Sequence, residues 1–447
     1  MSSQSAELTR ETIRHYTILG QFDMALTLAL HQVTDLMLGD KHQLDGGLLI
    51  VDVNDLRRML LEDSAFDSVE FEIARPRESC RAGPIFDIVE PRAKAPGGSP
   101  DWPGILGAPH TAGFGTTHVL QGGAVTMLRE ESPGESRGVT GYVLEMNGEA
   151  ARASCYSKLW HVIVVPHTKA TIPRHTRHKA YRIAQLKVAV RLAQIAMDAP
   201  PTEIQILDTF TNPERAALMR VAYVGQIFSR QRKPEPEEQI IYGVNTEGML
   251  PTLLHPNEWV DGAITTSYHT SIGGAETYFY QNNPVIAELY RRHNQGELNF
   301  VGTLATIAAA DNLDRERNTQ FAAHLVKWAL RADAAVLTKF GGGVPHSDLA
   351  ETARLLEGDG IKTAVQVTDL ARDHRVESAL LFNFPEVDAI VCIGGNDTRW
   401  QLSRVERVIA ANSAMAELLG EPLEIDALNV VGVANQQGAS RLRSVVY

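Results

Sequence analysis

The feature that most constrains the fold is an alternation of strand-like and helix-like segments in the last third of the chain. Apolar runs typical of buried strands occur at residues 299–306, 334–338, 363–367 and 389–393. The segments between them, at about 315–331, 348–357 and 372–382, have helical patterns long enough for crossover connections. This alternation predicts an α/β fold with a doubly wound, mostly parallel sheet. Ligands in such sheets bind beyond the carboxyl ends of the strands.

The first half of the chain has a different pattern, in which short β-prone runs are separated by turn-forming residues. These runs lie at 47–53, 68–73, 117–126, 140–146 and 161–165. Apolar residues then recur at three- and four-residue spacing from Ile183 to Met197, which predicts a helix with one buried face. We therefore expect a β-rich α+β domain over 1–229, a connecting segment over 230–298, and the doubly wound domain over 299–447.

Composition excludes several classes of function. The formal net charge of −12 argues against a nucleic-acid partner or an anionic membrane surface, because phosphate groups are held mainly by excess Lys and Arg. The apolar runs are too short to span a bilayer, and residues 1–19 lack the pattern of a secretory signal, so we expect a cytoplasmic protein. Cys80, Cys155 and Cys392 are too widely spaced for a redox motif.

Two glycine-rich loops follow predicted strands, at 339–348 and 393–397. Glycine lets backbone amides approach a ligand closely, and a helix N-terminus favours an anion, so a carboxylate or phosphate group fits there. Tight strand-to-helix turns are an equally good interpretation, since neither loop has a known phosphate-binding pattern. His346 is the side chain of the first loop that exchanges protons near neutral pH, although loop histidines are more often structural.

Histidines do not fall in a spacing that indicates a metal site. His175 and His178 stand beside Arg174 and Arg177, which favours the basic start of a helix over a set of zinc ligands. Metal binding is therefore a weak expectation, with no ligands assigned.

Several longer motifs resemble those of a known family. They include Ala74-Arg75-Pro76-Arg77-Glu78-Ser79-Cys80-Arg81, Asp87-Ile88-Val89-Glu90-Pro91-Arg92, Gly115-Thr116-Thr117-His118, Asp261-Gly262-Ala263-Ile264-Thr265, Asn299-Phe300-Val301-Gly302 and Gly394-Gly395-Asn396. In this order they resemble the component B proprotein (alpha and beta subunits) of glycine, sarcosine and betaine reductases, which is related to the D-proline reductase proprotein. The resemblance covers nearly the whole chain.

The resemblance implies a specific chemistry. In that family the proprotein is cut at an Asn-Cys bond after the Asp-Gly-Ala-Ile-Thr motif, and the new terminal Cys becomes a pyruvoyl group. The pyruvoyl carbonyl forms a Schiff base with the substrate amine and acts as an electron sink for reductive C–N cleavage. A selenocysteine or cysteine of a partner subunit then attacks.

This sequence departs from the family at that bond, where Tyr268 and His269 replace Asn and Cys. Cleavage needs a Ser, Thr or Cys nucleophile, which His269 does not supply. We therefore expect an uncleaved chain with no self-generated pyruvoyl group. Thr266, Ser267, Thr270 and Ser271 leave open a shifted cleavage.

The resulting hypothesis is a subunit of a reductase component B-like complex that acts on a small amine or amino-acid-like substrate. Its expected partner is a second component B-like subunit with a reactive Cys or selenocysteine, in a hetero-oligomer. The expected catalytic residues are His269, Tyr268, Asp261 and His346. The expected substrate contacts are Arg75, Glu78, His118, Thr265, Glu276, Gly342, Gly343, Gly395 and Asn396.

Three alternatives remain at this level. The chain could be a non-catalytic structural or substrate-presenting subunit, or a metal-dependent non-redox enzyme in which a metal ion supplies the lost electrophilicity. A stand-alone nucleotide-binding enzyme ranks last, because it rests on the fold pattern alone.

Overall fold

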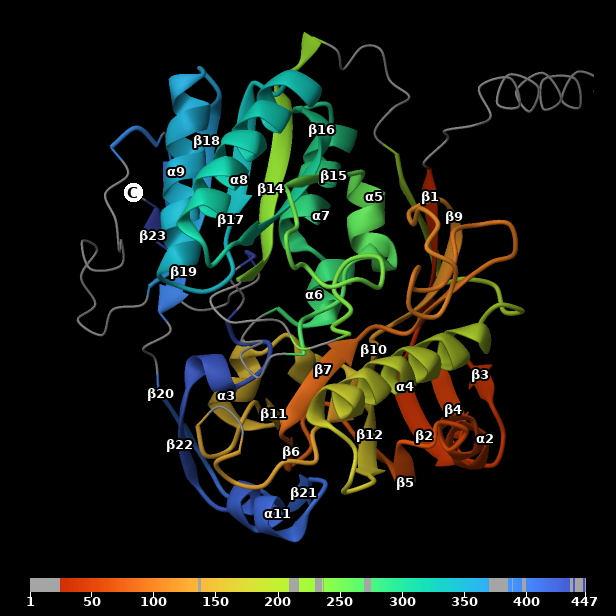
Figure 1. Ribbon diagram of the computed structural model, residues 1–447. Helices are drawn as coiled ribbons and strands as arrows, with labels where there is room; N and C mark the ends of the chain where they lie inside the picture. Colours follow the sequence, from red (N-terminus) through yellow and green to blue (C-terminus); the bar gives the residue numbers. More distant parts are fainter. Residues whose placement is uncertain are drawn as a thin grey trace, which may run out of the picture.

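The computed structural model describes residues 25–135, 138–208, 217–229, 235, 237–268, 275–369, 385–387, 389–395, 399–434, 437–438 and 445–446. Within these residues the chain forms a mixed α/β structure, as predicted. A layered α/β region occupies the upper part of Figure 1, and a β-rich region with one long helix lies below it.

The α/β region is built on a seven-stranded sheet with the order β15-β16-β14-β17-β18-β19-β23. The five inner strands are parallel, and the two edge strands are antiparallel to their neighbours. The strands are β14 (Arg220–Ser229), β15 (Thr252–Leu254), β16 (Asn299–Ala308), β17 (Ala334–Thr338), β18 (Lys362–Asp369), β19 (Ala389–Gly395) and β23 (Val445–Val446). After β14, the chain first adds β16 on one side and then β17 on the other. The strand order therefore reverses at β14, and a crevice at the carboxyl ends is expected there.

Helices cover both faces of this sheet, as a doubly wound fold requires. Helices α8 (Asn312–His324) and α9 (Val344–Gly358) pack on one face, and α7 (Pro284–Asn294) packs on the other. Strand β14 alternates accordingly, because Val221 and Tyr223 join one apolar cluster while Ala222 and Val224 join the other. A parallel strand that is covered on both faces reads as a nearly continuous apolar run.

The predicted strands of this region are confirmed, with two differences at the helices. Helix α9 begins at Val344 rather than at 348, because Pro345 is well tolerated in the first turn of a helix. Helix α8 begins at Asn312, after the capping side chain of Asp311. The helix predicted at 372–382 lies outside the described residues. The domain boundary expected after residue 229 would assign β14 to a different domain from the other strands of its sheet.

The β-rich region contains two four-stranded sheets, with the orders β13-β1-β9-β8 and β5-β12-β10-β7. Helix α4 (Arg174–Gln194) contacts strands of both sheets, and twelve of its residues are buried. The strands are β1 (Leu26–Gln32), β5 (Phe66–Ala74), β7 (Ile85–Val89), β8 (Arg92–Lys94), β9 (Gly115–Gln121), β10 (Gly123–Leu128), β12 (Trp160–Thr168) and β13 (Glu203–Leu207). The single strand predicted at 117–126 is thus two strands, in two different sheets.

Gly122 makes this division possible. Its φ is +88°, and a Cβ atom there would lie 2.8 Å from the carbonyl oxygen of Val33. Only glycine adopts this conformation without strain, so the chain turns sharply from one sheet into the other.

Smaller elements complete the β-rich region. Strands β2 (Asp35–Gly39), β3 (Gln43–Asp45) and β4 (Leu48–Asp52) form a sheet beside α2 (Val53–Leu60), and two-residue β11 (Leu144–Glu145) pairs with β6 (Cys80–Ala82). The strands predicted at 47–53, 68–73 and 161–165 are confirmed. Within the strand predicted at 140–146, only the two residues of β11 form a strand.

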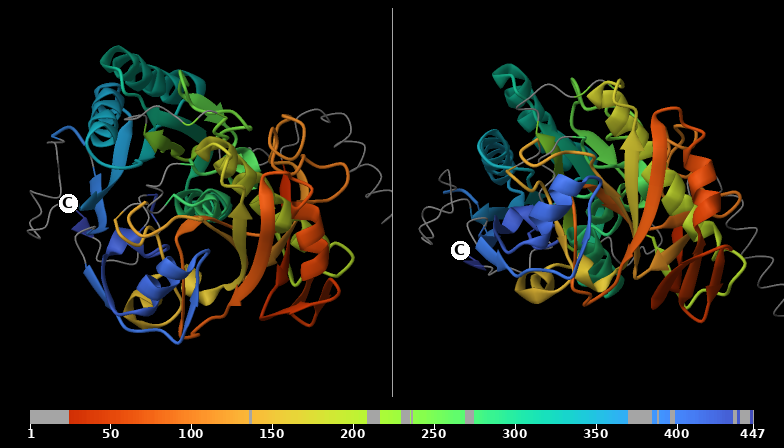
Figure 2. Two further views of the ribbon diagram at one scale, coloured as in Figure 1. Left: turned by 60° about the horizontal axis from the view of Figure 1, so that its bottom comes forward. Right: turned by 90° about the horizontal axis from the view of Figure 1, so that it is seen from below.

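The C-terminal segment returns to the β-rich region. Strand β21 (Arg407–Ile409) pairs in parallel with β6, and the hairpin of β20 (Arg399–Leu402) and β22 (Leu423–Asp426) lies with α11 (Ser413–Gly420) beside it. Figure 2 shows this blue segment against the strands of the N-terminal half. The buried Arg81 guanidinium holds the contact, because it binds the Glu145 carboxylate and donates to the carbonyl of Leu419 at 2.6 Å. Residues 399–434 therefore lie against the β-rich region, although the doubly wound domain was expected to cover all of 299–447.

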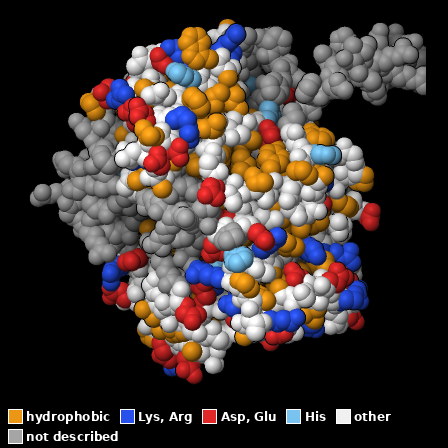
Figure 3. Space-filling view, in the orientation of Figure 1, with side chains coloured by type: hydrophobic (Ala, Val, Ile, Leu, Met, Phe, Trp, Pro, Cys, Tyr) orange, Lys and Arg blue, Asp and Glu red, His pale blue; other side chains and the backbone are white. Residues whose placement is uncertain are grey.

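The surface in Figure 3 agrees with the charge argument from the sequence. Basic and acidic side chains are interspersed over the lower, β-rich region of this face, and no broad basic area is visible. Within the described ranges, no helix is long and apolar enough to cross a membrane.

Candidate functional site

The segment that leads to residue 268 lies at the junction of the two regions. Short helix α5 (Pro256–Glu258) continues into a π-helical turn at Trp259–Ala263, in which Gly262 has a φ of +97°. The chain then runs extended, and Thr265 donates from its backbone to Ile240 at 2.8 Å and from its hydroxyl to the Gln239 carbonyl at 2.6 Å. The predicted substrate contact Thr265 is therefore fully buried and held by backbone groups.

Asp261 is anchored in the β-rich region by four donors. Its carboxylate forms an ion pair with the Lys94 ammonium and accepts hydrogen bonds from the Ser99 hydroxyl (3.0 Å), the Gly113 backbone (2.9 Å) and the Thr117 hydroxyl (3.0 Å). Burial lowers the pKa of Lys94, and the nearby carboxylate opposes that effect. This geometry gives Asp261 a structural role, while the predicted catalytic role stays a prediction.

Tyr268 is fully buried and held by both its backbone and its side chain. Its backbone N–H donates to Glu238 at 2.7 Å, its carbonyl accepts from the Arg129 guanidinium at 3.0 Å, and its hydroxyl donates to Gln239 at 3.0 Å. The ring packs against Phe86, with centroids 6.0 Å apart. Burial raises the pKa of the Tyr268 hydroxyl well above its usual range, so it remains a neutral donor. His269 lies outside the described residues.

A buried ion pair fixes the backbone on both sides of residues 269–274. The Arg182 guanidinium pairs with Asp87 and donates to the carbonyl of Thr266 at 2.8 Å. Asp87 also accepts from the Thr277 backbone at 2.9 Å and from its hydroxyl. Thr277 begins α6 (Thr277–Gln281), and its hydroxyl accepts from the backbone of Thr266 at 3.0 Å.

Glu276 joins this buried arrangement from the other side. Its side chain is fully buried and accepts a hydrogen bond from the Tyr156 hydroxyl at 3.2 Å. Thr265, Tyr268 and Glu276 are thus buried in the chain on either side of residues 269–274, while Asp261 is fixed a few residues earlier in the same segment.

The other predicted residues lie apart from this cluster. Arg75 is exposed in the turn after β5, where its backbone donates to Glu78 at 2.9 Å, and Glu78 also pairs with Arg407. His118 on β9 contacts His31 on β1, with ring nitrogens 3.0 Å apart. Among the described residues, no hydrogen bond or ion pair joins Arg75, Glu78 or His118 to Tyr268. Their predicted substrate contacts stay predictions.

The glycine loop after β17 has an arrangement of its own. Gly343 has a φ of +70° immediately before α9, and Gly342 is half-buried. His346 in the first turn of α9 is completely buried. Burial, together with the nearby Lys339 ammonium, lowers the pKa of His346 to about 4. The ring is therefore neutral at pH 7, which disfavours a proton exchange near neutrality. Gly395 ends β19, and Asn396 lies outside the described residues.

Because His346 is buried, we expect the free energy of unfolding to depend on pH. The folded-state pKa of about 4 lies below the ordinary value of 6.5, so the unfolded chain binds more protons between these pH values. The neutral His346 ring therefore contributes to the stability of the folded chain above about pH 6.5, and this contribution is lost as the pH falls toward 4. We expect urea denaturation of His346→Gln to show a weaker pH dependence over this range than the unmodified chain. The exposed His110→Gln variant should keep the original dependence, and equal slopes for all three proteins would contradict the assignment.

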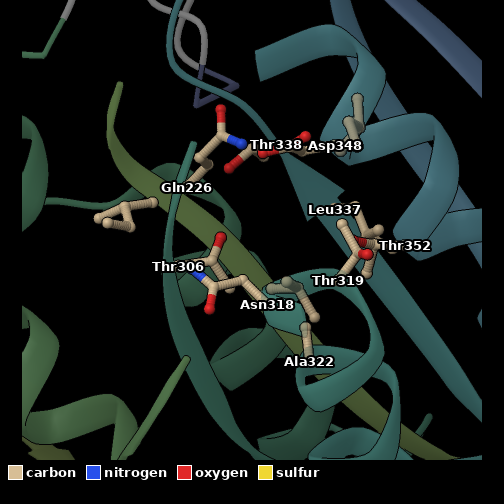
Figure 4. A pocket seen from close by; sticks show the side chains of 12 residues that line it. Gln226, Thr306, Asn318, Thr319, Ala322, Leu337, Thr338, Asp348 and Thr352 are labelled. Atoms are coloured by element: carbon tan, nitrogen blue, oxygen red, sulfur yellow. The ribbon is translucent and has the colours of Figure 1, made fainter. Parts of the chain in front are cut away.

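A narrow pocket lies at the point where the strand order reverses, as Figure 4 shows. It has a volume of about 20 Å³, which is room for about one water molecule. Its polar residues come from the carboxyl ends of β14, β16 and β17 and from the two covering helices: Gln226, Thr306, Thr338, Asn318, Thr319, Asp348 and Thr352. None of these residues is among the catalytic residues or substrate contacts expected from the sequence. Their signal is a polar side chain at the end of each apolar strand run.

Metal binding stays an untested expectation. Within the described residues, no group of three or more His, Cys, Asp and Glu side chains is placed to hold a metal ion.

The chain is similar to known proteins over most of its length. The family model for glycine/sarcosine/betaine reductase component B subunits matches residues 24–430. The glycine reductase complex component B subunits alpha and beta of Acetoanaerobium sticklandii are 30% identical over 382 residues, covering 84% of this chain and 86% of that protein. No solved structure matches the chain.

Two further relatives come from Peptoclostridium acidaminophilum. Its glycine reductase complex component B subunits alpha and beta are 28% identical over 426 residues, covering 93% of this chain and 98% of that protein. Its sarcosine reductase complex component B subunit alpha is 29% identical over 404 residues, covering 89% and 92%.

Proposed function

Since this chain belongs to the family of glycine/sarcosine/betaine reductase component B subunits, we propose that it works in a reductase-like complex without a pyruvoyl group of its own. Its substrate is a small amine or amino-acid-like molecule, and the reaction is reductive cleavage of a C–N or related bond. The chain stays continuous through residues 268 and 269.

The setting of residue 268 carries this proposal. The family motif ends at Thr265, and the residue expected before the scissile bond is a tyrosine whose ring, hydroxyl and peptide groups all have partners. The next residue, His269, cannot act as the nucleophile that chain cleavage requires. A buried tyrosine followed by a residue that cannot attack its carbonyl supports a chain that stays whole.

The chemical roles follow from what the two residues offer. Tyr268 is a neutral hydroxyl donor in a fixed position, and it anchors the backbone from which His269 extends. We propose that His269 supplies acid/base chemistry where relatives with the family motif place their electrophile. A bound metal ion is a second source of electrophilicity, which metal analysis of the purified complex tests.

Reduction needs a thiol or selenol, which we place on a partner subunit. Among described cysteines, Cys80 is buried in an apolar cluster, and burial raises the pKa of its thiol to about 12. Such a thiol is a poor nucleophile at neutral pH. The names of the relatives, which are components of reductase complexes, support a partner subunit here.

The test combines mass and activity measurements on one anaerobic preparation. We expect denaturing mass spectrometry of the complex to give a single species of 49.0 kDa for this chain. We also expect His269→Ala to lower the turnover of the reconstituted complex by at least about tenfold, because general acid/base groups contribute that much or more. The exposed His110→Ala variant serves as the control.

Two outcomes would change this view. Two fragments in place of one chain would overturn the uncleaved state. An unchanged rate for His269→Ala would assign the chain to the non-catalytic, substrate-presenting role instead.

A further inference from the structure

A wide, open hollow in the β-rich region is lined by basic side chains. Its volume is about 670 Å³, and its wall includes Arg77, Arg152 and Lys158. No Asp or Glu is among the described residues that line it. The chain as a whole has a net charge of −12, so three cations around one hollow stand out from the average surface. We call this hollow the Arg77 pocket.

The three cations come from three separate segments of the chain. Arg77 lies in the turn that follows β5, Arg152 lies in α3 (Gly148–Ala153), and Lys158 ends a single 3₁₀ turn. All three side chains are exposed, and none forms an ion pair or a side-chain hydrogen bond with another described residue. The fold therefore brings three cations together that its own described residues do not neutralise.

Other exposed arginines of this chain are paired. Arg58, Arg291 and Arg354 each form an ion pair with a carboxylate one helical turn away. The Arg77 pocket differs from these surfaces because its positive charge faces solvent without a counter-charge. It can therefore accept an anion without first breaking an ion pair.

The backbone at Arg77 is strained. The Glu78 backbone N–H donates to the Arg75 carbonyl at 3.1 Å, so Pro76 and Arg77 are the central residues of a tight turn. The φ of Arg77 is +68°, and a residue with such a φ at the third turn position is usually glycine or asparagine. A long side chain in this conformation is uncommon and destabilises the folded chain, which indicates a role for the guanidinium other than folding.

The rest of the wall is largely apolar and includes an indole ring. Trp160, at the start of β12, is half-buried, and Pro76, Met146 and Ala151 also line the pocket. Trp160 is the one aromatic residue among the described residues of this wall. An indole offers a planar apolar surface on which another flat ring can pack.

We propose that the Arg77 pocket binds a nucleotide, with its phosphates on Arg77, Arg152 and Lys158 and its base against Trp160. A guanidinium donates two parallel N–H groups to phosphate oxygens, and a lysine ammonium adds a point charge. Three cations suit a ligand with several negative charges better than one with a single carboxylate. The volume lies within the range of small-molecule sites.

This site goes beyond the proposed function. None of the residues that line it is among the expected catalytic residues or substrate contacts, and it is separate from the glycine-rich loops, which lie in the α/β region. The nucleotide is therefore a second ligand of the chain, in addition to the substrate of the proposed reaction.

Calorimetric titration of the full-length chain tests the site, with ADP, adenosine and pyrophosphate as probes. We expect ADP to bind and adenosine to bind at least about tenfold more weakly, because it lacks the charge-assisted hydrogen bonds of the phosphates. We expect pyrophosphate to bind about threefold or more weakly than ADP, because it lacks a ring to pack on Trp160.

Variants separate binding from folding. Glycine adopts a positive φ without strain, so Arg77→Gly should melt at or above the temperature of the unmodified chain while its affinity for ADP falls by about tenfold or more. Arg152→Gln and Trp160→Leu should also weaken ADP binding, and Trp160→Phe, which keeps a flat ring, should bind better than Trp160→Leu. The exposed Arg58→Gln and Lys41→Gln variants are matched controls and should bind as the unmodified chain does.

The outcomes that would contradict this inference are distinct. Unaltered ADP binding by Arg77→Gly would overturn the site. Equal binding of adenosine and ADP would overturn the role of the three cations, and equal binding of pyrophosphate and ADP would overturn the contact with Trp160. A hexaglutamate peptide that binds more tightly than ADP would assign the pocket to an acidic protein segment instead. None of these measurements uses the reductase reaction, so the failure of one proposal leaves the other standing.

Discussion

Replacing Asp261 by alanine is expected to lower the free energy of unfolding by about 3–5 kcal/mol, because it leaves the Lys94 ammonium buried without a counter-charge. The same change removes the acceptor for Ser99, Gly113 and Thr117. Each buried donor left unpaired adds to the cost. Urea denaturation at pH 7 measures the loss.

Two further variants separate the charge from the geometry. The exposed Asp45→Ala variant on strand β3 is the control and should change stability by less than about 0.5 kcal/mol. Lys94→Met combined with Asp261→Leu should recover part of the loss, because replacing both partners of a buried ion pair is often nearly neutral. If Asp261→Ala were as stable as the unmodified chain, the carboxylate would not be the anchor of this segment.

Placing a nucleophile at residue 269 is expected to change the covalent state of the protein. In His269→Cys, we expect the chain to break between residues 268 and 269, because the thiol restores the group that the family uses. The Tyr268 carbonyl already accepts a hydrogen bond from Arg129 at 3.0 Å, which polarises it for attack. Denaturing electrophoresis and mass spectrometry report two fragments in place of one.

The controls test the two parts of this argument. His269→Ala lacks a nucleophile and should remain a single chain. Adding Arg129→Lys to His269→Cys should slow the cleavage by about a hundredfold, as the loss of an oxyanion donor does in other enzymes. A folded His269→Cys protein that stays intact would show that the surroundings of Tyr268 no longer permit the reaction.

Local patterns predicted much of the fold, and the misses have physical causes. Strands β16 to β19 and helix α4 have apolar periodicities that the sequence shows directly. The place of β14 inside the sheet depends on its pairing with β16 and β17, which are far from it in the sequence. The return of β21 to β6 depends on the buried Arg81, whose partners come from three separate segments.

The candidate site was predicted in part. The family motif led to Asp261, Thr265 and Tyr268, which the structure places in one continuous, buried segment. It did not indicate Arg129 or Arg182, because their importance comes from contacts with residues more than eighty positions away. The sequence signal that could have indicated them is a charged residue inside an otherwise apolar pattern.

The pairing of distant segments has a consequence for any break in this chain. Strand β14 comes before residue 269 in the sequence, yet it lies between β16 and β17, which both come after residue 269. In the same way, β21 from the C-terminal part pairs with β6 from the N-terminal part. The two portions are therefore interlocked through shared sheets. A nicked protein would migrate as one particle under native conditions, so size alone would never reveal whether the backbone is whole.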